Sequence, residues 1–223
     1  MIRYFGQAQY SPKKILMGYE LFLREYVDGH WRFPKNLRQY GARELAQLAE
    51  QTIMMIEPAA KIVSINLDQD QFIDNDFVQM FAVLADKFPE RSIVVELTEH
   101  ECGGAMAGLR TAAAQYAANN VFVCLDDVGS GANGKTMASV MDAYVSEYKF
   151  ALQNFSERDG SMANLLPQLG EWAKRAKQFH KEFVVEGIED QRNLNIVSQF
   201  TPNIIQGYFF AKPVLVPLTT DIF

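Results

Sequence analysis

Short apolar segments rich in β-branched residues alternate along the chain with longer segments whose apolar residues recur every three to four positions. The first pattern is typical of buried strands and the second of helices that pack on a sheet. The expected strands are residues 2–9, 15–23, 61–66, 93–97, 121–125, 144–150, 182–185 and 203–206. The expected helices are residues 36–55, 70–87, 105–119, 162–180 and 190–199.

Strand and helix alternate from about residue 60 to the end, which predicts a parallel sheet with crossover helices. No Gly-x-Gly-x-x-Gly loop follows a strand, so a closed barrel is favoured over a dinucleotide-binding fold. The first two strands are joined by the turn Ser11-Pro12-Lys13-Lys14 and predict an antiparallel hairpin. The expected fold is therefore α/β, a TIM-like (β/α)8 barrel modified by an antiparallel first strand, in a single domain spanning residues 1–223.

Composition places the chain among soluble globular proteins, with 48% hydrophobic and 22% charged residues. The N-terminus lacks the apolar core of a signal peptide, and no apolar segment is long enough to span a membrane. Cys102 and Cys124 are interpreted as reduced thiols in a cytoplasmic protein, Cys124 within the core. A net charge of −6 argues against a DNA or RNA duplex as partner, but not against a small phosphate ligand, because metal ions can supply positive charge.

Polar side chains end or follow most of the expected strands. In a parallel barrel the carboxyl ends of the strands converge on one rim, so these residues would meet in space. Each has an ordinary structural reading as well. Asp127 or Thr98 could cap a helix, and Glu99 could be a first-turn acid favoured by the helix dipole. Lys149 could form a plain salt bridge, and Gln206 could be a turn residue. The residues in question are Glu20, Asn66, Glu96, Thr98, Glu99, Asp126, Asp127, Lys149, Glu186 and Gln206.

Taken together, these residues would place five carboxylates around one cavity, provided that the strand of Glu20 runs parallel to the others. Such a cluster must take up protons or bind cations. Two divalent ions contribute about +4 and Lys149 contributes +1, which balances five negative groups. Oxygen donors together with the amide of Asn66 suit Mg²⁺ or Mn²⁺ rather than zinc, and only His100 among the histidines lies near a strand end. The residues alone thus predict a two-metal, phosphate-handling barrel. Its acids are Glu20, Glu96, Asp126, Asp127 and Glu186.

Six segments, in order and each at an expected strand end, resemble the motifs of the EAL family of cyclic di-GMP phosphodiesterases. The first has Glu-Leu-Phe where the family has Glu-Ala-Leu. The likeness extends over about residues 4–213. The segments are Gly18-Tyr19-Glu20-Leu21-Phe22-Leu23-Arg24, Ser64-Ile65-Asn66-Leu67, Glu96-Leu97-Thr98-Glu99, Asp126-Asp127-Val128-Gly129-Ser130-Gly131, Glu186-Gly187-Ile188-Glu189 and Gln206-Gly207-Tyr208-Phe209-Phe210-Ala211-Lys212-Pro213.

This resemblance implies hydrolysis of cyclic di-GMP to linear pGpG by a water that two Mg²⁺ or Mn²⁺ ions activate. The first ion would be held by Glu20, Asn66, Glu96 and Asp126. Asp126 would bridge to the second ion, which is held also by Asp127 and Glu186. Lys149 would orient or activate the water. The catalytic residues implied are Glu20, Lys149 and Glu186.

The same resemblance assigns residues around the ligand. Arg24 would bind a phosphate as a bidentate donor, with Leu21, Asn66 and Gln206 as further substrate-binding residues. Leu21 could equally belong to the core. Glu99 would brace the loop after Asp127, and that loop with its adjoining helix implies a homodimer.

Two departures from the family pattern leave a second function open. The family shows Lys-Ile-Asp where this chain has Lys149-Phe150-Ala151, and the loop 128–135 differs from the usual sequence. A chain that only binds cyclic di-GMP as a receptor, or a protein-interaction module on the same scaffold, are the alternatives to an active phosphodiesterase.

Overall fold

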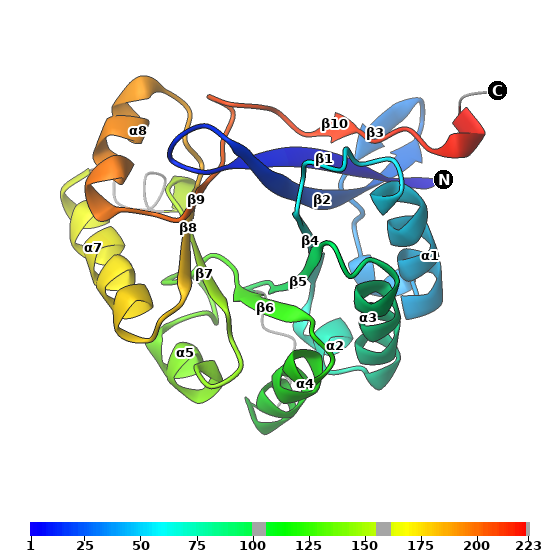
Figure 1. Ribbon diagram of the computed structural model, residues 1–223, viewed down its shortest axis with the longest axis horizontal. Helices are drawn as coiled ribbons and strands as arrows, with labels where there is room; N and C mark the ends of the chain where they lie inside the picture. The colour runs from blue at the N-terminus through cyan, green and yellow to red at the C-terminus, as the bar shows by residue number, and fades with distance from the viewer. Residues whose placement is uncertain (100–105, 155–161, 222–223) are drawn as a thin grey trace.

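The structure is a computed structural model that describes residues 1–99, 106–154 and 162–221. Eight strands form a closed ring in the order β1-β9-β8-β7-β6-β5-β4-β2, and β2 pairs again with β1. Figure 1 shows this ring with the helices on its outside. The barrel strands are β1 (Ile2–Tyr10), β2 (Leu16–Val27), β4 (Ile62–Leu67), β5 (Ser92–Leu97), β6 (Phe122–Leu125), β7 (Glu147–Ala151), β8 (Glu182–Glu186) and β9 (Ile204–Ile205).

The first strand runs against its neighbours, as the hairpin pattern predicts. β1 pairs antiparallel with both β2 and β9, whereas β2 pairs parallel with β4. Glu20 lies opposite Gln7 on β1 and Ser64 on β4. The strand of Glu20 therefore runs with the parallel strands, and this carboxylate points to the same rim as the other strand ends. The predicted modified barrel is confirmed.

Helices lie on the outside of the ring, and the C-terminal strand β10 (Val214–Leu215) pairs with β1 (Figure 1). The short strand β3 (His30–Arg32) extends β2 as an antiparallel hairpin. The helices are α1 (Ala42–Ile53), α2 (Gln69–Phe72), α3 (Asn75–Lys87), α4 (Met106–Ala118), α5 (Lys135–Met141), α7 (Met162–Gln178) and α8 (Gln191–Val197), with 3₁₀ turns at Leu37–Gln39, Ser198–Phe200 and Thr219–Asp221.

Several predicted boundaries were wrong. The predicted helix 36–55 begins only at Ala42, and the predicted helix 70–87 is split because Asp74 caps a new helix by accepting a hydrogen bond from the Asp76 amide. The predicted strand 144–150 begins at Glu147. Helix α5 was not predicted, since its seven residues are too few to show a helical period after a glycine-rich loop.

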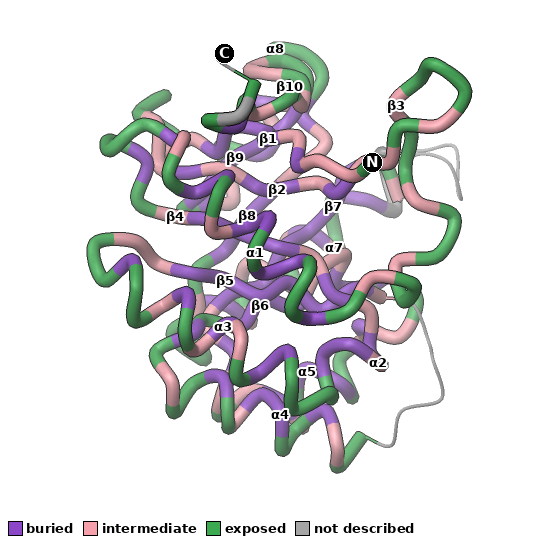
Figure 2. Tube along the Cα trace, turned by 90° about the vertical axis from the view of Figure 1, so that its right-hand side faces the viewer, coloured by how far each residue is buried: buried purple, intermediate pink, exposed green. Residues whose placement is uncertain are grey.

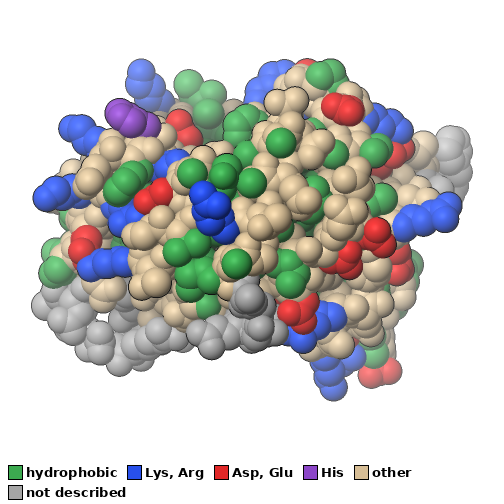
Figure 3. Space-filling view, turned by 90° about the horizontal axis from the view of Figure 1, so that it is seen from below, with side chains coloured by type: hydrophobic (Ala, Val, Ile, Leu, Met, Phe, Trp, Pro, Cys, Tyr) green, Lys and Arg blue, Asp and Glu red, His purple; other side chains and the backbone are tan. Residues whose placement is uncertain are grey.

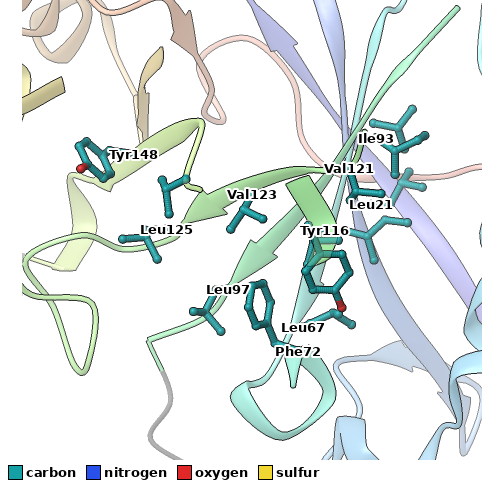
Figure 4. Close-up of a cluster of buried hydrophobic side chains, with 14 of the residues drawn as sticks. Leu21, Leu67, Phe72, Ile93, Leu97, Tyr116, Val121, Val123, Leu125 and Tyr148 are labelled. Atoms are coloured by element: carbon teal, nitrogen blue, oxygen red, sulfur yellow. The ribbon is translucent and has the colours of Figure 1, made fainter. Parts of the chain in front are cut away.

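The alternation of side chains along each strand separates an apolar outer layer from a polar interior. On β5 and β6, Val95, Leu97, Val123 and Leu125 are fully buried beneath the helices. Figure 4 shows Leu97, Val123 and Leu125 with Phe72 and Tyr116 in this outer core, and Figure 2 shows that burial follows the strands. Successive strand residues point to opposite faces, so Glu96 faces into the barrel. Packing the apolar side chains under the helices therefore places the alternating acidic side chains, such as Glu96, in the barrel interior.

The surface carries charges of both signs. In the view of Figure 3, lysine and arginine side chains are interspersed with acidic and hydrophobic ones. In the molecule as a whole, Lys135 pairs with Glu171, and Arg175 pairs with Asp142. None of the helices in the described ranges is long and apolar enough to cross a membrane. Cys124 is a buried free thiol as predicted, whereas His100 and Cys102 lie outside the described residues.

Candidate active site

A cavity of about 530 Å³ opens at the carboxyl ends of the barrel strands. Nine of the eleven predicted site residues line it. Lys149 and Glu96, which end up fully buried inside the barrel, do not. The structure thus brings the predicted residues together from seven strands and their following loops. The nine lining residues are Glu20, Leu21, Arg24, Asn66, Glu99, Asp126, Asp127, Glu186 and Gln206.

Lys149 lies at the centre of the acidic cluster, beneath the cavity. Its ammonium group donates to Glu20 Oε2 at 3.0 Å and also to Glu96 Oε2. It faces inward because its neighbours Tyr148 and Phe150 occupy the opposite face of β7, where both are fully buried. The ammonium group of Lys149 therefore lies among the acids and contacts two of their carboxylates directly.

One ammonium cannot neutralise two carboxylates. Burial raises the pKa of Glu20, but Lys149 and the hydrogen bonds that Glu20 accepts lower it overall. Burial and the nearby charge of Glu20 hold the pKa of Glu96 well above its usual range. Burial lowers the pKa of Lys149, yet the surrounding acids raise it well above its usual range, so Lys149 stays protonated.

Amide side chains complete the surroundings of Glu20. Asn66 Nδ2 donates to Glu20 Oε1 at 2.7 Å, and Gln206 Nε2 donates to Glu20 Oε2 at 2.9 Å. Gln206 Nε2 also reaches Gln7 Oε1 at 3.1 Å. Gln7, which is buried directly opposite Glu20, was not predicted. The sequence shows only a polar residue within the expected strand 2–9.

Three further acids lie at the ends of β6 and β8. Asp126 Oδ1 accepts a hydrogen bond from the Asp127 amide at 2.9 Å, and Glu186 Oε1 accepts one from Gln153 Nε2 at 2.8 Å. Burial raises the pKa of Asp127 to about 6 and that of Glu186 to about 7. Burial also holds the pKa of Asp126 well above its usual range. These acids retain protons at mildly acidic pH unless a cation displaces them.

The loop after Asp127 contacts Glu99 and is held by Asn133, a residue that was not predicted. Asn133 Nδ2 donates to the carbonyl oxygens of Leu97 and Asp126, both at 2.7 Å. The amide of Ala132 donates to the Glu99 carbonyl oxygen at 3.0 Å. Gly131 has a φ of +47° and packs so closely on Glu99 that a Cβ atom there would lie 2.7 Å from Glu99 Cγ. Glu99 therefore lies against the loop that it was predicted to brace.

Arg24 lies at the outer wall of the cavity on an aromatic surface. Its guanidinium carbon is 3.2 Å from the ring centroid of Phe33 and 5.6 Å from that of Phe22. No carboxylate among the described residues forms an ion pair with Arg24. The group is half-buried with its charge available to an anion in the cavity. Phe33 follows the short hairpin strand β3, which the sequence pattern did not predict.

The donor set of this site fits a hard divalent cation. Carboxylate and amide oxygens predominate, and two buried oxygens, Glu96 Oε1 and Asp127 Oδ1, accept no hydrogen bond. In the described ranges, however, no three acidic, histidine or cysteine side chains stand close enough together to form a ready metal site. Glu20 and Glu96 instead contact the ammonium group of Lys149. Cation binding would therefore require these two carboxylates to turn from the ammonium group.

The raised pKa values of Asp127 and Glu186 predict how stability changes with pH in EDTA. A raised pKa in the folded protein means that stability is present below the unfolded values of 3.8 and 4.5 and is lost as pH rises through about 6 and 7. We expect the free energy of unfolding to fall by on the order of 4 kcal/mol between pH 5 and pH 8. Thermal unfolding across this range measures it.

Excess Mn²⁺ should raise the melting temperature more at pH 8 than at pH 5, because metal ligands must be deprotonated. If the protein in EDTA is as stable at pH 8 as at pH 5, or more stable, Asp127 and Glu186 are not buried acids with raised pKa values.

The fold and this arrangement define a TIM-like barrel with an acidic, lysine-centred site at its carboxyl rim. The family model for the EAL domain matches residues 37–213, and the chain belongs to the EAL domain family. No curated protein sequence gives a significant match.

Solved structures of EAL proteins share the fold. The chain is 22% identical to the EAL enzyme Bd1971 in its cAMP- and cyclic-di-GMP-bound form, with a TM-score of 0.79 over 96% of this chain and 62% of that one. It is 16% identical to the Bacillus subtilis YkuI protein, in complex with substrate c-di-GMP and calcium, with a TM-score of 0.77 over 97% and 57%. It is 16% identical to the PaMucR phosphodiesterase c-di-GMP complex, with a TM-score of 0.79 over 100% and 94%. The chain thus spans about three fifths of the length of the first two.

Proposed function

We propose that the chain binds cyclic di-GMP in the cavity at the carboxyl rim and hydrolyses one phosphodiester bond to give linear pGpG. The observation that carries this proposal is the meeting of five acids, Lys149 and Arg24 at one end of the barrel. Cyclic di-GMP carries two phosphates, so it needs cationic partners in a cavity that is otherwise acidic. That the EAL structures of YkuI and PaMucR hold c-di-GMP supports the same ligand here.

Two divalent cations, Mg²⁺ or Mn²⁺, would supply an activated water and neutralise charge on the phosphate. Glu20, Asn66, Glu96 and Asp126 would hold one ion, and Asp126, Asp127 and Glu186 the other. Calcium in the YkuI complex supports a divalent ion at this kind of site.

The chain's own residues hold the substrate and the charges around it. Arg24 would donate to a phosphate oxygen while its guanidinium rests on Phe33, and Leu21 would give an apolar contact. Lys149 keeps a proton and a positive charge among the acids, and would stabilise negative charge that develops on the phosphate. Gln206 keeps Glu20 oriented, and Glu99 braces the loop that carries Asp127.

One observation favours a receptor without turnover as the second candidate. Ala151, fully buried at the end of β7, offers no carboxylate beside Glu186, and Lys149 occupies Glu20 and Glu96. A protein with one weakly held cation would bind the dinucleotide and cleave it slowly. A single domain over residues 1–223, a cytoplasmic location and a homodimer stay predictions.

Binding and cleavage are tested together. Isothermal calorimetry with cyclic di-GMP in Mg²⁺ or Mn²⁺ gives binding, and chromatography of the same samples gives pGpG. Binding with product is expected. Binding without product contradicts the phosphodiesterase and leaves the receptor, and no binding in either metal contradicts both.

Arg24→Met should weaken cyclic di-GMP binding by about 10–100-fold, because one charge-assisted hydrogen bond contributes roughly 1.5–3 kcal/mol. Arg32→Met is the matched control. Arg32 lies on the adjoining strand β3 and pairs with Glu25 on the surface. Equal affinities of the two variants would place the phosphate elsewhere.

A further inference from the structure

The segment that follows β7 provides two amide side chains at the mouth of the barrel. β7 ends at Ala151, and Gln153 and Asn154 come within the next three residues. Gln153 lines the cavity together with Asp127 and Glu186. Amide groups donate hydrogen bonds without adding charge, so they can orient carboxylates while leaving the net charge of the site unchanged.

Gln153 contacts one acid and packs against a neighbouring glycine. Its Nε2 atom donates to Glu186 Oε1 at 2.8 Å. Its Oε1 atom packs against Gly187, where a Cβ atom would lie 1.8 Å away, and Gly187 has a φ of +73°. The amide therefore lies against the Gly187 backbone, with its nitrogen toward Glu186. Within the described part of the chain, no other hydrogen bond reaches the Glu186 carboxylate, so Oε2 is left for a ligand in the cavity.

Asn154 makes a similar contact with Asp127. A hydrogen bond from its side chain reaches Asp127 and favours the charged form of that carboxylate. Asp127 Oδ1 is buried and accepts no hydrogen bond. Asp127 itself is fixed by a φ of +49° and by its amide, which donates to Asp126. Two adjacent amides thus hold two acids from different strands, and each acid keeps one oxygen uncommitted.

We propose that Gln153 and Asn154 are positioning residues that fix Glu186 and Asp127 as ligands of one divalent cation, the more weakly held of the two. This inference rests on the proposed function, because it requires a cation at that place. Partners of metal ligands of this kind typically contribute about 10–100-fold to metal affinity. This cation would have three protein ligands, Asp126, Asp127 and Glu186, against four at the other ion, and the two neutral amides add no charge to it.

Mn²⁺ titration followed by electron paramagnetic resonance tests the inference without any turnover. Wild-type protein is expected to bind two Mn²⁺ ions of different affinity. Gln153→Met keeps the length of the side chain and removes the donor, and Asn154→Leu does the same for its contact. Each variant should weaken the looser site by about 10–100-fold and leave the tighter site unchanged.

Gln191→Ala is the matched control, since Gln191 Nε2 also donates at 2.8 Å, to Asn195 on exposed helix α8. Melting temperatures in EDTA show whether each variant is folded. Two unchanged Mn²⁺ sites in folded Gln153→Met and Asn154→Leu would overturn the positioning inference and leave the phosphodiesterase standing. Equal weakening of both sites would also overturn it. Wild-type protein that binds no Mn²⁺ would overturn the two-metal proposal together with this inference.

Discussion

Replacing Lys149 by methionine is expected to lower the free energy of unfolding by about 3–5 kcal/mol at pH 8 in EDTA. The ammonium group is fully buried and is the cation that contacts both Glu20 and Glu96. Without it, two buried carboxylates lose their ion pair and face each other in a medium of low dielectric constant. Urea unfolding at pH 8 measures the loss. At pH 5 the loss should be smaller, because Glu96 already tends to hold a proton.

Lys87→Met is the matched control for this experiment. Lys87 also forms an ion pair, with Glu50, but both side chains are partly exposed, so this pair should contribute less than about 1 kcal/mol. Excess Mn²⁺ should restore more stability to Lys149→Met than to the wild type, since a cation replaces the lost charge. A loss no larger than that of the control would show that Glu20 and Glu96 do not depend on Lys149.

Replacing Glu20 by glutamine is expected to reduce kcat/KM for cyclic di-GMP hydrolysis by at least about 100-fold. Partners of metal ligands already contribute up to about that factor, and a ligand itself contributes no less. The substitution keeps the size of the side chain and removes its charge. It also disturbs the contacts with Asn66, Gln206 and Lys149. Initial rates of pGpG formation at several Mn²⁺ concentrations measure the effect.

Glu25→Gln provides the comparison within the same strand. Glu25 lies on β2 and faces outward, where it pairs with Arg32 and accepts a hydrogen bond from Tyr40. Its substitution should leave kcat/KM within about twofold of wild type, because the site is not contacted. If Glu20→Gln also keeps its rate, Glu20 does not hold a catalytic cation.

Residues at strand ends could be predicted because their placement follows from topology alone. Once strands and helices alternate, the barrel forces Glu20, Asn66, Asp126 and Glu186 onto one rim, whatever the details of packing. The antiparallel first strand could also be predicted, because a short polar turn between two apolar segments is typical of a hairpin.

What the sequence did not reveal depends on pairing across the barrel. Gln7 belongs to the site because Gln206, which follows β9, donates to both Gln7 and Glu20, and no local sequence pattern contains that contact. Phe33 depends on the three-residue strand β3, which is too short to show alternation. Counting charges placed Lys149 among the acids, but a charge count gives no information about which atoms are in contact. It could not tell that the ammonium group would contact Glu20 and Glu96.

The antiparallel strand β1 also determines when the site can exist during synthesis. Gln7 meets Gln206 across 199 residues of chain, and β1 has no partner on that side until β9 has been made. Contacts so distant along the chain form late, because the loop between them must first be closed. Chains emerging N-terminus first would therefore carry Glu20 for most of their synthesis without the glutamine that orients it. The ring closes and the acidic site is completed in nearly the same step, so a ribosome-bound fragment that ends before β9 has neither.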